Sequence, residues 1–301
     1  MVMIIYGDCR DKLKELEPES VQMCVTSPPY WGLRDYGHND QIGLEKTPEE
    51  YTANMVSVFR EVKRVMKDNG TLWLNLGDSY AGNNSRASTG GRAGYGTKRE
   101  GVFNNLSGNL KQKDLVGIPW RVAFALQADG WYLRQDIIWH KPNPMPESVT
   151  DRCTKSHEYI FLLSKSAKYF YDSQAIKEDA KYPEGPNSPS SIKKGKGEFG
   201  MDTRGGLSKI GNLLKKNKRS VWTVTTKPYS GSHFAVFPQE LIEPCIQAGS
   251  RVGDTVLDPF FGSGTTGEVA ERFGRNYIGI ELNEDYKSLQ QKRCGQMGLG
   301  F

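Results

Sequence analysis

Short apolar runs alternate with helical patterns along this chain, and that alternation most constrains how it can fold. Residues 2–6, 21–27 and 71–76 are apolar or β-branched runs bounded by polar turns, a pattern that predicts buried strands. A helix opened by Thr47-Pro48 and ended by Asn69-Gly70 is expected between the last two runs. Because strands that alternate with helices form parallel sheets covered by those helices, an α/β fold is predicted.

The alternation resumes in the second half of the chain. A helix is expected over residues 115–130, with Gly130 as its cap, before strands over residues 137–139 and 159–163. Four further elements are predicted: helix 238–248, strand 255–258, helix 265–273 and strand 277–281. Together these elements predict a doubly wound, mostly parallel sheet.

Composition narrows the class of protein. No eighteen apolar residues run together, and residues 1–6 lack the pattern of a secretory signal, so we expect a cytoplasmic protein of a prokaryotic cell or a phage-infected host. Five scattered cysteines without a Cys-x-x-Cys pair argue against disulfides and structural zinc. The formal charge of +5 is only mildly basic, so the distribution of charge matters more than its total.

Two basic segments interrupt the alternation. Residues 81–113 are rich in Gly, Asn and Ser and carry six Lys or Arg against one acid, Glu100. Both a DNA-contacting lid and a plain mobile insertion fit such a loop. Residues 172–220 hold eleven Lys or Arg against six Asp or Glu, which suits either a solvated linker or an arm that follows DNA phosphates.

A glycine loop, DPFFGSGTT at residues 258–266, follows a predicted strand and opens a helix. Its glycines allow close approach to a ligand, and amides at the helix start favour a carboxylate. Glu281 ends the next strand, where an acid can accept two hydrogen bonds from a ribose. The loop lacks Gly-Lys-Ser/Thr, and Asp258 would repel phosphate, so an adenosine-bearing cofactor is predicted, with a dinucleotide enzyme as the alternative.

The motif TSPPYW, residues 26–31, stands at the carboxyl end of a predicted strand, where ligands of open α/β sheets bind. Its two prolines remove backbone donors and restrict the chain, so the carbonyls of Ser27 and Pro28 can face a substrate as acceptors. Alone, the motif also fits a proline-rich turn with a packed tyrosine. In combination with the glycine loop, it favours a catalytic clamp.

A clamp of acceptors suits methylation of an exocyclic base amine, a poor nucleophile whose lone pair is delocalised into the ring. The Ser27 hydroxyl and the Pro28 carbonyl would draw the amine hydrogens out of the ring plane and stabilise positive charge moving onto nitrogen. Tyr30 would stack on an extruded base, a contact worth about 1–3 kcal/mol, and Trp31 would back it. Solvent can take the released proton, so neither a strong base nor a metal is expected.

These motifs resemble those of the beta-class, or permuted, amino-methyltransferases of DNA, in which the catalytic motif precedes the cofactor motif. The resemblance covers most of the chain, and the family's cofactor loop is matched at every defined position from Asp258 to Thr266. It implies S-adenosylmethionine as cofactor and a circularly permuted, seven-stranded sheet of the class I methyltransferase type with a basic insertion. In that family, Ser-Pro-Pro-Tyr is associated with cytosine N4 methylation, whereas Asp or Asn at the first position is more usual for adenine N6.

The resemblance also implies site residues. It places residues 233–238 over the methionine end of the cofactor and Asp8 near its adenine, although Asp8 also fits a helix N-cap. The expected catalytic residues are Ser27, Pro28, Pro29 and Tyr30. The expected cofactor contacts are Asp8, Thr26, Phe234, Pro238, Asp258, Pro259, Phe260, Gly262, Ser263, Gly264, Thr265, Thr266 and Glu281.

Double-stranded DNA is the expected partner. We expect residues 1–171 to form the catalytic half of the domain, 172–220 a target-recognition insertion and 221–301 the cofactor half. The expected DNA contacts are Trp31, Arg86, Arg92, Lys98, Arg99, Lys193, Lys194, Lys196, Lys215 and Lys216. A cognate restriction endonuclease and a monomeric or homodimeric state are compatible with the sequence but not specified by it.

Four alternatives remain beside cytosine N4 methylation. Adenine N6 methylation uses the same chemistry. Carbon-5 cytosine methylation needs a cysteine nucleophile, and Cys245 stands in a predicted amphipathic helix, where a core role is favoured. Protein or RNA amine methylation usually shows the cofactor loop first, and a DNA-binding module without activity would not need an intact clamp.

Overall fold

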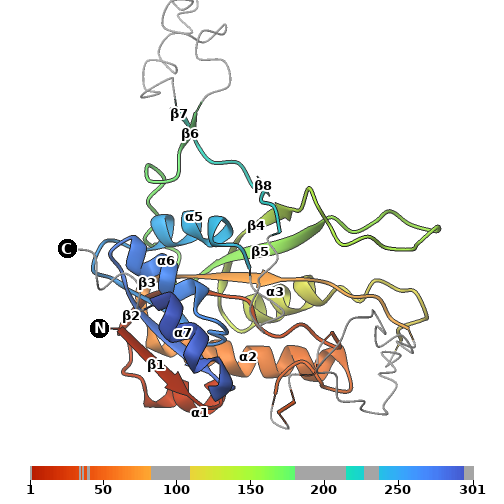
Figure 1. Ribbon diagram of the computed structural model, residues 1–301, viewed down its shortest axis with the longest axis horizontal. Coiled ribbons are helices and arrows are strands. Elements are labelled where there is room, and N and C mark those ends of the chain that lie inside the picture. Colours follow the sequence, from red (N-terminus) through yellow and green to blue (C-terminus); the bar gives the residue numbers. More distant parts are fainter. Residues whose placement is uncertain are drawn as a thin grey trace, which may run out of the picture.

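The computed structural model describes residues 2–33, 35, 37–38, 41–82, 109–179, 215–226 and 237–294. Its main sheet has eight strands in the order β1-β10-β9-β2-β3-β5-β4-β8 (Figure 1). The strands are β1 Val2–Tyr6, β2 Val21–Thr26, β3 Met66–Leu76, β4 Tyr132–His140, β5 His157–Ser164, β8 Val221–Thr223, β9 Thr255–Asp258 and β10 Asn276–Glu281.

Most neighbouring strands of this sheet are parallel. The pairs from β1 through β10, β9 and β2 to β3 are all parallel, whereas β5 runs antiparallel to both β3 and β4. The predicted α/β fold with a mostly parallel sheet is therefore confirmed. The sheet has one strand more than the seven expected, because the three residues of β8 pair in parallel with the outer edge of β4.

Helices cover both faces of the sheet. Because successive side chains of a strand point to opposite faces, the apolar side chains on each face need a layer of helices to bury them. On β3, Leu72 and Leu74 pack in one hydrophobic core with α1, α2 and α3, whereas Trp73 packs in a second core with α5 and α6. Figure 1 shows α5 on one side of the sheet and α1 and α2 on the other. The helices are α1 Cys9–Lys12, α2 Pro48–Val65, α3 Ile118–Ala128, α5 Gln239–Gly249, α6 Thr265–Arg272 and α7 Lys287–Cys294, with short 3-10 turns η1 Leu13–Glu15 and η3 Glu284–Tyr286.

The end of α2 differs from the prediction. The helix ends at Val65, and β3 begins at Met66, so Asn69 and Gly70 lie inside the strand instead of stopping the helix. The pairing of β2 with β3 is irregular here, since Val21 pairs with Met66 and Met23 with Thr71. A Cβ on Gly70 would lie 2.8 Å from the Gln22 carbonyl oxygen, so the glycine permits a close backbone approach at this irregularity.

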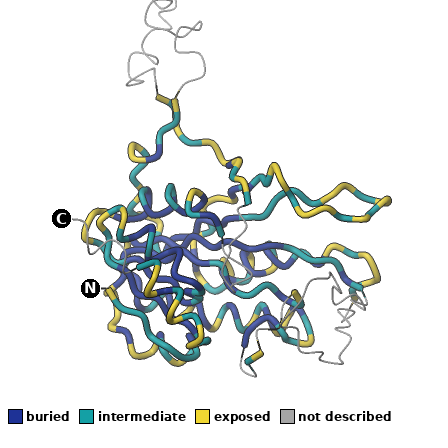
Figure 2. The backbone as a smooth tube through the Cα atoms, in the orientation of Figure 1, coloured by how far each residue is buried: buried dark blue, intermediate teal, exposed yellow. Residues whose placement is uncertain are grey.

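Two other features extend from the sheet and its helices. The β4–β5 connection and the two-stranded pair of β6 Glu178–Asp179 with β7 Lys215–Lys216 project from the body, and many of their residues are exposed (Figure 2). No helix in the described part of the chain is long and apolar enough to cross a membrane.

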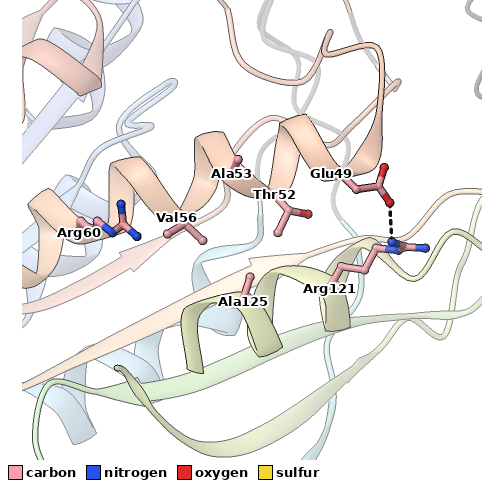
Figure 3. A pocket seen from close by; sticks show the side chains of 7 residues that line it. All are labelled: Glu49, Thr52, Ala53, Val56, Arg60, Arg121 and Ala125. Atoms are coloured by element: carbon pink, nitrogen blue, oxygen red, sulfur yellow. Dashed lines mark hydrogen bonds and ion pairs between the residues drawn. The ribbon is translucent and has the colours of Figure 1, made fainter. Parts of the chain in front are cut away.

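A groove lies between α2 and α3 (Figure 3). Glu49 and Arg121 form an ion pair of 2.9 Å across it. It is lined by Glu49, Thr52, Ala53, Val56, Arg60, Arg121 and Ala125. None of these residues belongs to the predicted clamp or glycine loop, so the groove is not the candidate site.

We predict that Gly70→Ala lowers the free energy of unfolding by about 1–3 kcal/mol, the usual cost of forcing an extra group into a packed position. The new Cβ would meet backbone oxygens of Gln22 and Lys67 at 2.8 and 2.9 Å. Gly82→Ala is the matched control, because a Cβ there meets nothing within 4 Å. Urea unfolding of the two variants checks this, and equal midpoints would contradict it.

Candidate active site

The predicted functional motifs meet at one edge of the sheet. Ser27 follows β2, the glycine loop follows β9, and Glu281 ends β10, all three strands being parallel neighbours in the order β10-β9-β2. Asp8 follows β1, whose Tyr6 pairs with Glu281 of β10. Because the carboxyl ends of parallel strands share one edge, four segments far apart in sequence border the same site.

The carboxylate of Asp258 connects the clamp strand to the glycine loop. Thr26 Oγ1 donates to Asp258 Oδ1 and Thr266 Oγ1 to Oδ2, each at 2.6 Å. The backbone amide of Phe260 also donates to Oδ1, at 3.0 Å. Asp258 is only 1% exposed, so these internal donors, and not solvent, satisfy it. Burial raises the pKa of Asp258 to about 6, although the two threonine hydroxyls and the amide oppose the shift.

Glu281 holds the other side of the glycine loop. Its Oε2 accepts the backbone amide of Gly262 at 2.6 Å, and its Oε1 accepts the amide of Asn283 at 2.8 Å. Burial raises its pKa above the ordinary value. Each carboxylate oxygen has a second lone pair beyond these amides, so a ribose contact fits but stays a prediction.

Two glycines give the loop its shape. Gly262 and Gly264 have φ values of 54° and 90°, a region that disfavours side chains, and Gly264 is the N-cap of α6. The loop therefore turns tightly and presents the start of α6 at the sheet edge, as its sequence predicts.

Helix α7 supports the loop from the far end of the described chain. Gln290, fully buried, donates from Nε2 to the Gly262 carbonyl at 2.7 Å and accepts from the Tyr6 hydroxyl at 2.6 Å. Arg293 Nη1 donates to Ser263 Oγ at 2.8 Å and also to Thr265 Oγ1. Sequence reasoning missed both residues. Their helix has only two apolar residues, Leu289 and Cys294, so no apolar stripe marks the face that turns inward.

A buried tyrosine of α2, Tyr51, holds the backbone of the clamp in place. Pro28 is buried, and the hydroxyl of the fully buried Tyr51 donates to the Pro29 carbonyl at 2.9 Å. Tyr51 therefore hydrogen-bonds to the carbonyl of Pro29. The two acceptors predicted for catalysis, the Ser27 hydroxyl and the Pro28 carbonyl, are different groups and do not bind Tyr51. Ser27 Oγ lies 3.4 Å from the Tyr30 hydroxyl and donates toward it.

The Tyr30 hydroxyl points into the protein. It lies 2.7 Å from Glu158 Oε2 and 3.2 Å from Asn75 Oδ1, neither of which the sequence analysis singled out. Burial raises the pKa of Tyr30 well above its ordinary value, and the negative charge of Glu158 adds to the effect. Tyr30 therefore stays a phenol, anchored at its outer end.

Trp31 corrects one expectation. It is only 2% exposed, packs in the core with α1, α2 and α3, and donates from Nε1 to the Glu45 carbonyl at 2.9 Å. Gly32, with φ of 65°, follows it in a turn, and its amide donates to the Gly43 carbonyl at 2.8 Å. Trp31 does not face solvent in this structure, so it is not available for the DNA contact expected from the sequence.

Other predicted residues have local partners. Asp8 is the N-cap of α1, accepting the Arg10 amide at 2.8 Å and pairing with its guanidinium, which confirms the N-cap interpretation and leaves the adenine contact a prediction. Pro238 is the N-cap of α5. Lys215 and Lys216 pair with Asp179 and Glu178, so part of their charge is balanced locally. Outside the described residues lie Phe234, Arg86, Arg92, Lys98, Arg99, Lys193, Lys194 and Lys196.

Comparison with known proteins identifies the family of the chain. Residues 21–292 match the sequence profile of a family described as DNA methylase. The type II methyltransferase M.SmaI of Serratia marcescens is 50% identical, over 96% of this chain and 89% of that protein. The type II methyltransferase M.Cfr9I of Citrobacter freundii is 48% identical, over 96% of this chain and 86% of that protein.

Solved structures share the fold. A candidate DNA modification methylase of Thermus thermophilus, in complex with S-adenosyl-L-methionine, superposes with a TM-score of 0.62 at 25% identity, over 100% of this chain and 96% of that one. The PvuII DNA methyltransferase, named as cytosine-N4-specific, superposes with a TM-score of 0.63 at 20% identity, over 96% of this chain and 85% of that one.

The buried Asp258 predicts a specific pH dependence of stability. Its pKa is about 6 in the folded chain against an ordinary value of 3.8, so the folded state binds the proton more tightly. This contribution to stability is fully present below pH 3.8 and is lost as the pH rises through about 6, a change of about 3 kcal/mol.

Asp258→Asn cannot titrate and removes this dependence. Between pH 4 and 7, the free energy of unfolding of the wild type should fall relative to that of the variant, which urea unfolding at several pH values measures. Parallel profiles for the two proteins would contradict the prediction.

Proposed function

Because this chain belongs to the DNA methylase family, we propose that it transfers the methyl group of S-adenosylmethionine to the exocyclic N4 amine of a cytosine extruded from DNA. The observation that carries the proposal is the adjacency of two motifs. The Thr26 hydroxyl, immediately before the clamp, donates to Asp258 at the start of the glycine loop. A substrate held by the clamp and a cofactor held by the loop would therefore lie beside each other.

The residues of the loop suit the cofactor. Three internal donors partly offset the charge of Asp258, and the free amides at the start of α6 favour a carboxylate there. Glu281 stands at the same edge with oxygens that can accept from ribose hydroxyls. The bound cofactor supplies an electrophilic methyl on a sulfonium. The residues of this chain hold the substrate amine in a position from which it can attack that methyl group.

The clamp suits the amine. The Ser27 hydroxyl and the Pro28 carbonyl accept its two hydrogens, and these hydrogen bonds strengthen as positive charge builds on nitrogen. The ring of Tyr30 stacks on the base and offsets part of the energy spent in extracting it. Solvent takes the proton that the methylated amine releases.

Ser27 favours cytosine as the base. The family tendency links serine at the first clamp position with cytosine N4 and Asp or Asn with adenine N6. Adenine N6 methylation is the second candidate, since the same acceptors fit its amine. The division of the chain into catalytic, target-recognition and cofactor segments, with Lys215 and Lys216 near DNA, belongs to this proposal. The proposal also includes a cytoplasmic location and a cognate restriction endonuclease. The type II names of the relatives support the endonuclease.

The test is methylation of plasmid DNA with labelled S-adenosylmethionine, followed by digestion to nucleosides and mass spectrometry. We expect N4-methylcytosine. Methylated adenine would overturn the choice of base, and no transfer by a folded, cofactor-binding protein would overturn the enzymatic function in favour of a binding module.

Clamp variants should lower this activity. Ser27→Ala should reduce kcat about 100-fold, as loss of one preorganised partner of the transition state does in other enzymes. Tyr30→Ala should reduce kcat/KM for DNA about 10- to 100-fold through lost stacking. Ser57→Ala, on the exposed side of α2, is the control and should leave both constants unchanged.

Turnover should be undiminished in EDTA, because neither the clamp nor the glycine loop requires a metal in this chemistry. In the described part of the chain, no three His, Cys, Asp or Glu side chains are grouped so as to hold a metal ion. Initial rates with and without the chelator check this, and a loss restored by a divalent cation would contradict it.

A further inference from the structure

The hydroxyl of Tyr30 lies against side chains from two strands of the sheet, β3 and β5. Glu158 lies at the start of β5 and Asn75 near the end of β3, and these strands pair side by side, with Asn75 opposite Ile160. The Asn75 amide nitrogen donates to the Tyr159 carbonyl at 3.0 Å, which turns its Oδ1 toward Tyr30. The clamp itself follows β2, so the hydroxyl joins the ends of β2, β3 and β5.

Glu158 is the partner to which Tyr30 donates. A phenol has a single hydrogen, and the Glu158 oxygen at 2.7 Å is nearer than the Asn75 oxygen at 3.2 Å. A carboxylate also accepts a stronger hydrogen bond than an amide. The phenol oxygen keeps its lone pairs for the donor Ser27 Oγ.

Lys141 keeps the carboxylate in place. The ammonium of Lys141, at the start of the β4–β5 connection, pairs with Glu158 Oε1, and both side chains are less than one-fifth exposed. The same ammonium lies 4.2 Å from the ring centroid of Trp139, a buried residue of β4. The charge of Glu158 also acts on Lys155 and His157, where it opposes the lowering of their pKa values by burial. With one oxygen bound to Lys141, Glu158 directs the other at Tyr30.

The ring of Tyr30 is confined on a second side by Gly77, the residue after β3. A Cβ at Gly77 would lie 2.5 Å from Cε2 of Tyr30, closer than real contacts allow. Tyr51 fixes the backbone beneath the ring through the Pro29 carbonyl. The ring is therefore fixed at its backbone, along one edge and at its hydroxyl.

We propose that Glu158 is a positioning residue of the clamp, which fixes Tyr30 through its hydroxyl in the one orientation that presents the ring face to the extruded base. This inference rests on the proposed function and extends it. Glu158 touches neither substrate nor cofactor and acts entirely through Tyr30. Its effect on catalysis therefore requires the phenolic hydroxyl.

A double-mutant cycle tests this dependence. Glu158→Ala and Tyr30→Phe should each lower kcat about 10- to 100-fold, the range open to loss of one hydrogen bond to a charged group. The double variant should be no slower than the slower single variant, because both changes remove the same contact. Affinity for S-adenosylmethionine, measured by calorimetry, should stay within twofold of the wild type. Losses that multiply, or an unchanged kcat in Glu158→Ala, would overturn the proposal.

Glu158→Gln separates positioning from proton acceptance. Its single amide oxygen can accept from Tyr30 and is a far weaker base, but Lys141 would compete for that oxygen. The change is therefore made together with Lys141→Met, and kcat should then recover to within a few-fold of the Lys141→Met variant. A Gln variant as slow as the Ala variant would overturn positioning in favour of a role for the charge. Glu61→Ala is the matched control, since Glu61 is also a partly buried acid paired with a base, Arg64, but lies on α2 away from the clamp.

A structural measurement keeps this test independent of the proposed function. If the wild type methylates no base, the proposed function fails, and the crystal structure of Glu158→Ala still decides the inference. The Tyr30 ring should leave its wild-type orientation in that variant, and an unmoved ring would overturn it. Thermal unfolding confirms that each variant is folded before it is assayed.

Discussion

The geometry of this molecule depends on one buried carboxylate. Asp258 ends a strand in the middle of the parallel region, and its oxygens accept from Thr26 on the neighbouring strand and from Thr266 in the helix that follows. A buried charge is costly unless donors surround it, and here those donors belong to the two segments that must be aligned. The requirement to satisfy Asp258 therefore fixes the distance between the clamp and the glycine loop. Glu281 repeats the arrangement on the next strand, where its carboxylate holds the loop through the Gly262 amide.

Much of the fold and part of the site follow from sequence patterns. Apolar runs and helical periodicity predict the main strands and helices, and the rule that parallel strands end at one edge brings Ser27, the glycine loop and Glu281 together. Boundaries are less secure where one residue type serves two purposes. A glycine often ends a helix, yet Gly70 lies inside β3, where it allows the backbones of β2 and β3 to approach closely. Local sequence contains no information that separates these roles, because the deciding neighbour, Gln22, is 48 residues away.

The parts of the site that sequence did not predict are its long-range contacts. Glu158 reaches Tyr30 across 128 positions, and Gln290 reaches Gly262 from a helix without an apolar stripe. Such contacts depend on strand order and register, which periodicity does not specify. Trp31 shows the same limit in reverse. The sequence around Trp31 is compatible with a side chain that faces a ligand and with one that packs in the core. The tertiary packing against α2 buries it in the core.

The pairing of β1 with β10 has a consequence for how the chain acquires its structure. Val2 pairs with Tyr277, so the first strand finds its neighbour only after some 270 further residues have been added. During synthesis, at about 5–20 residues per second, β1 would wait for many seconds without the strand that it pairs with in the sheet. The β2–β3 pair can form early, whereas the edge that carries the glycine loop is completed last. A nascent chain would therefore possess its clamp well before it possesses a place for the cofactor.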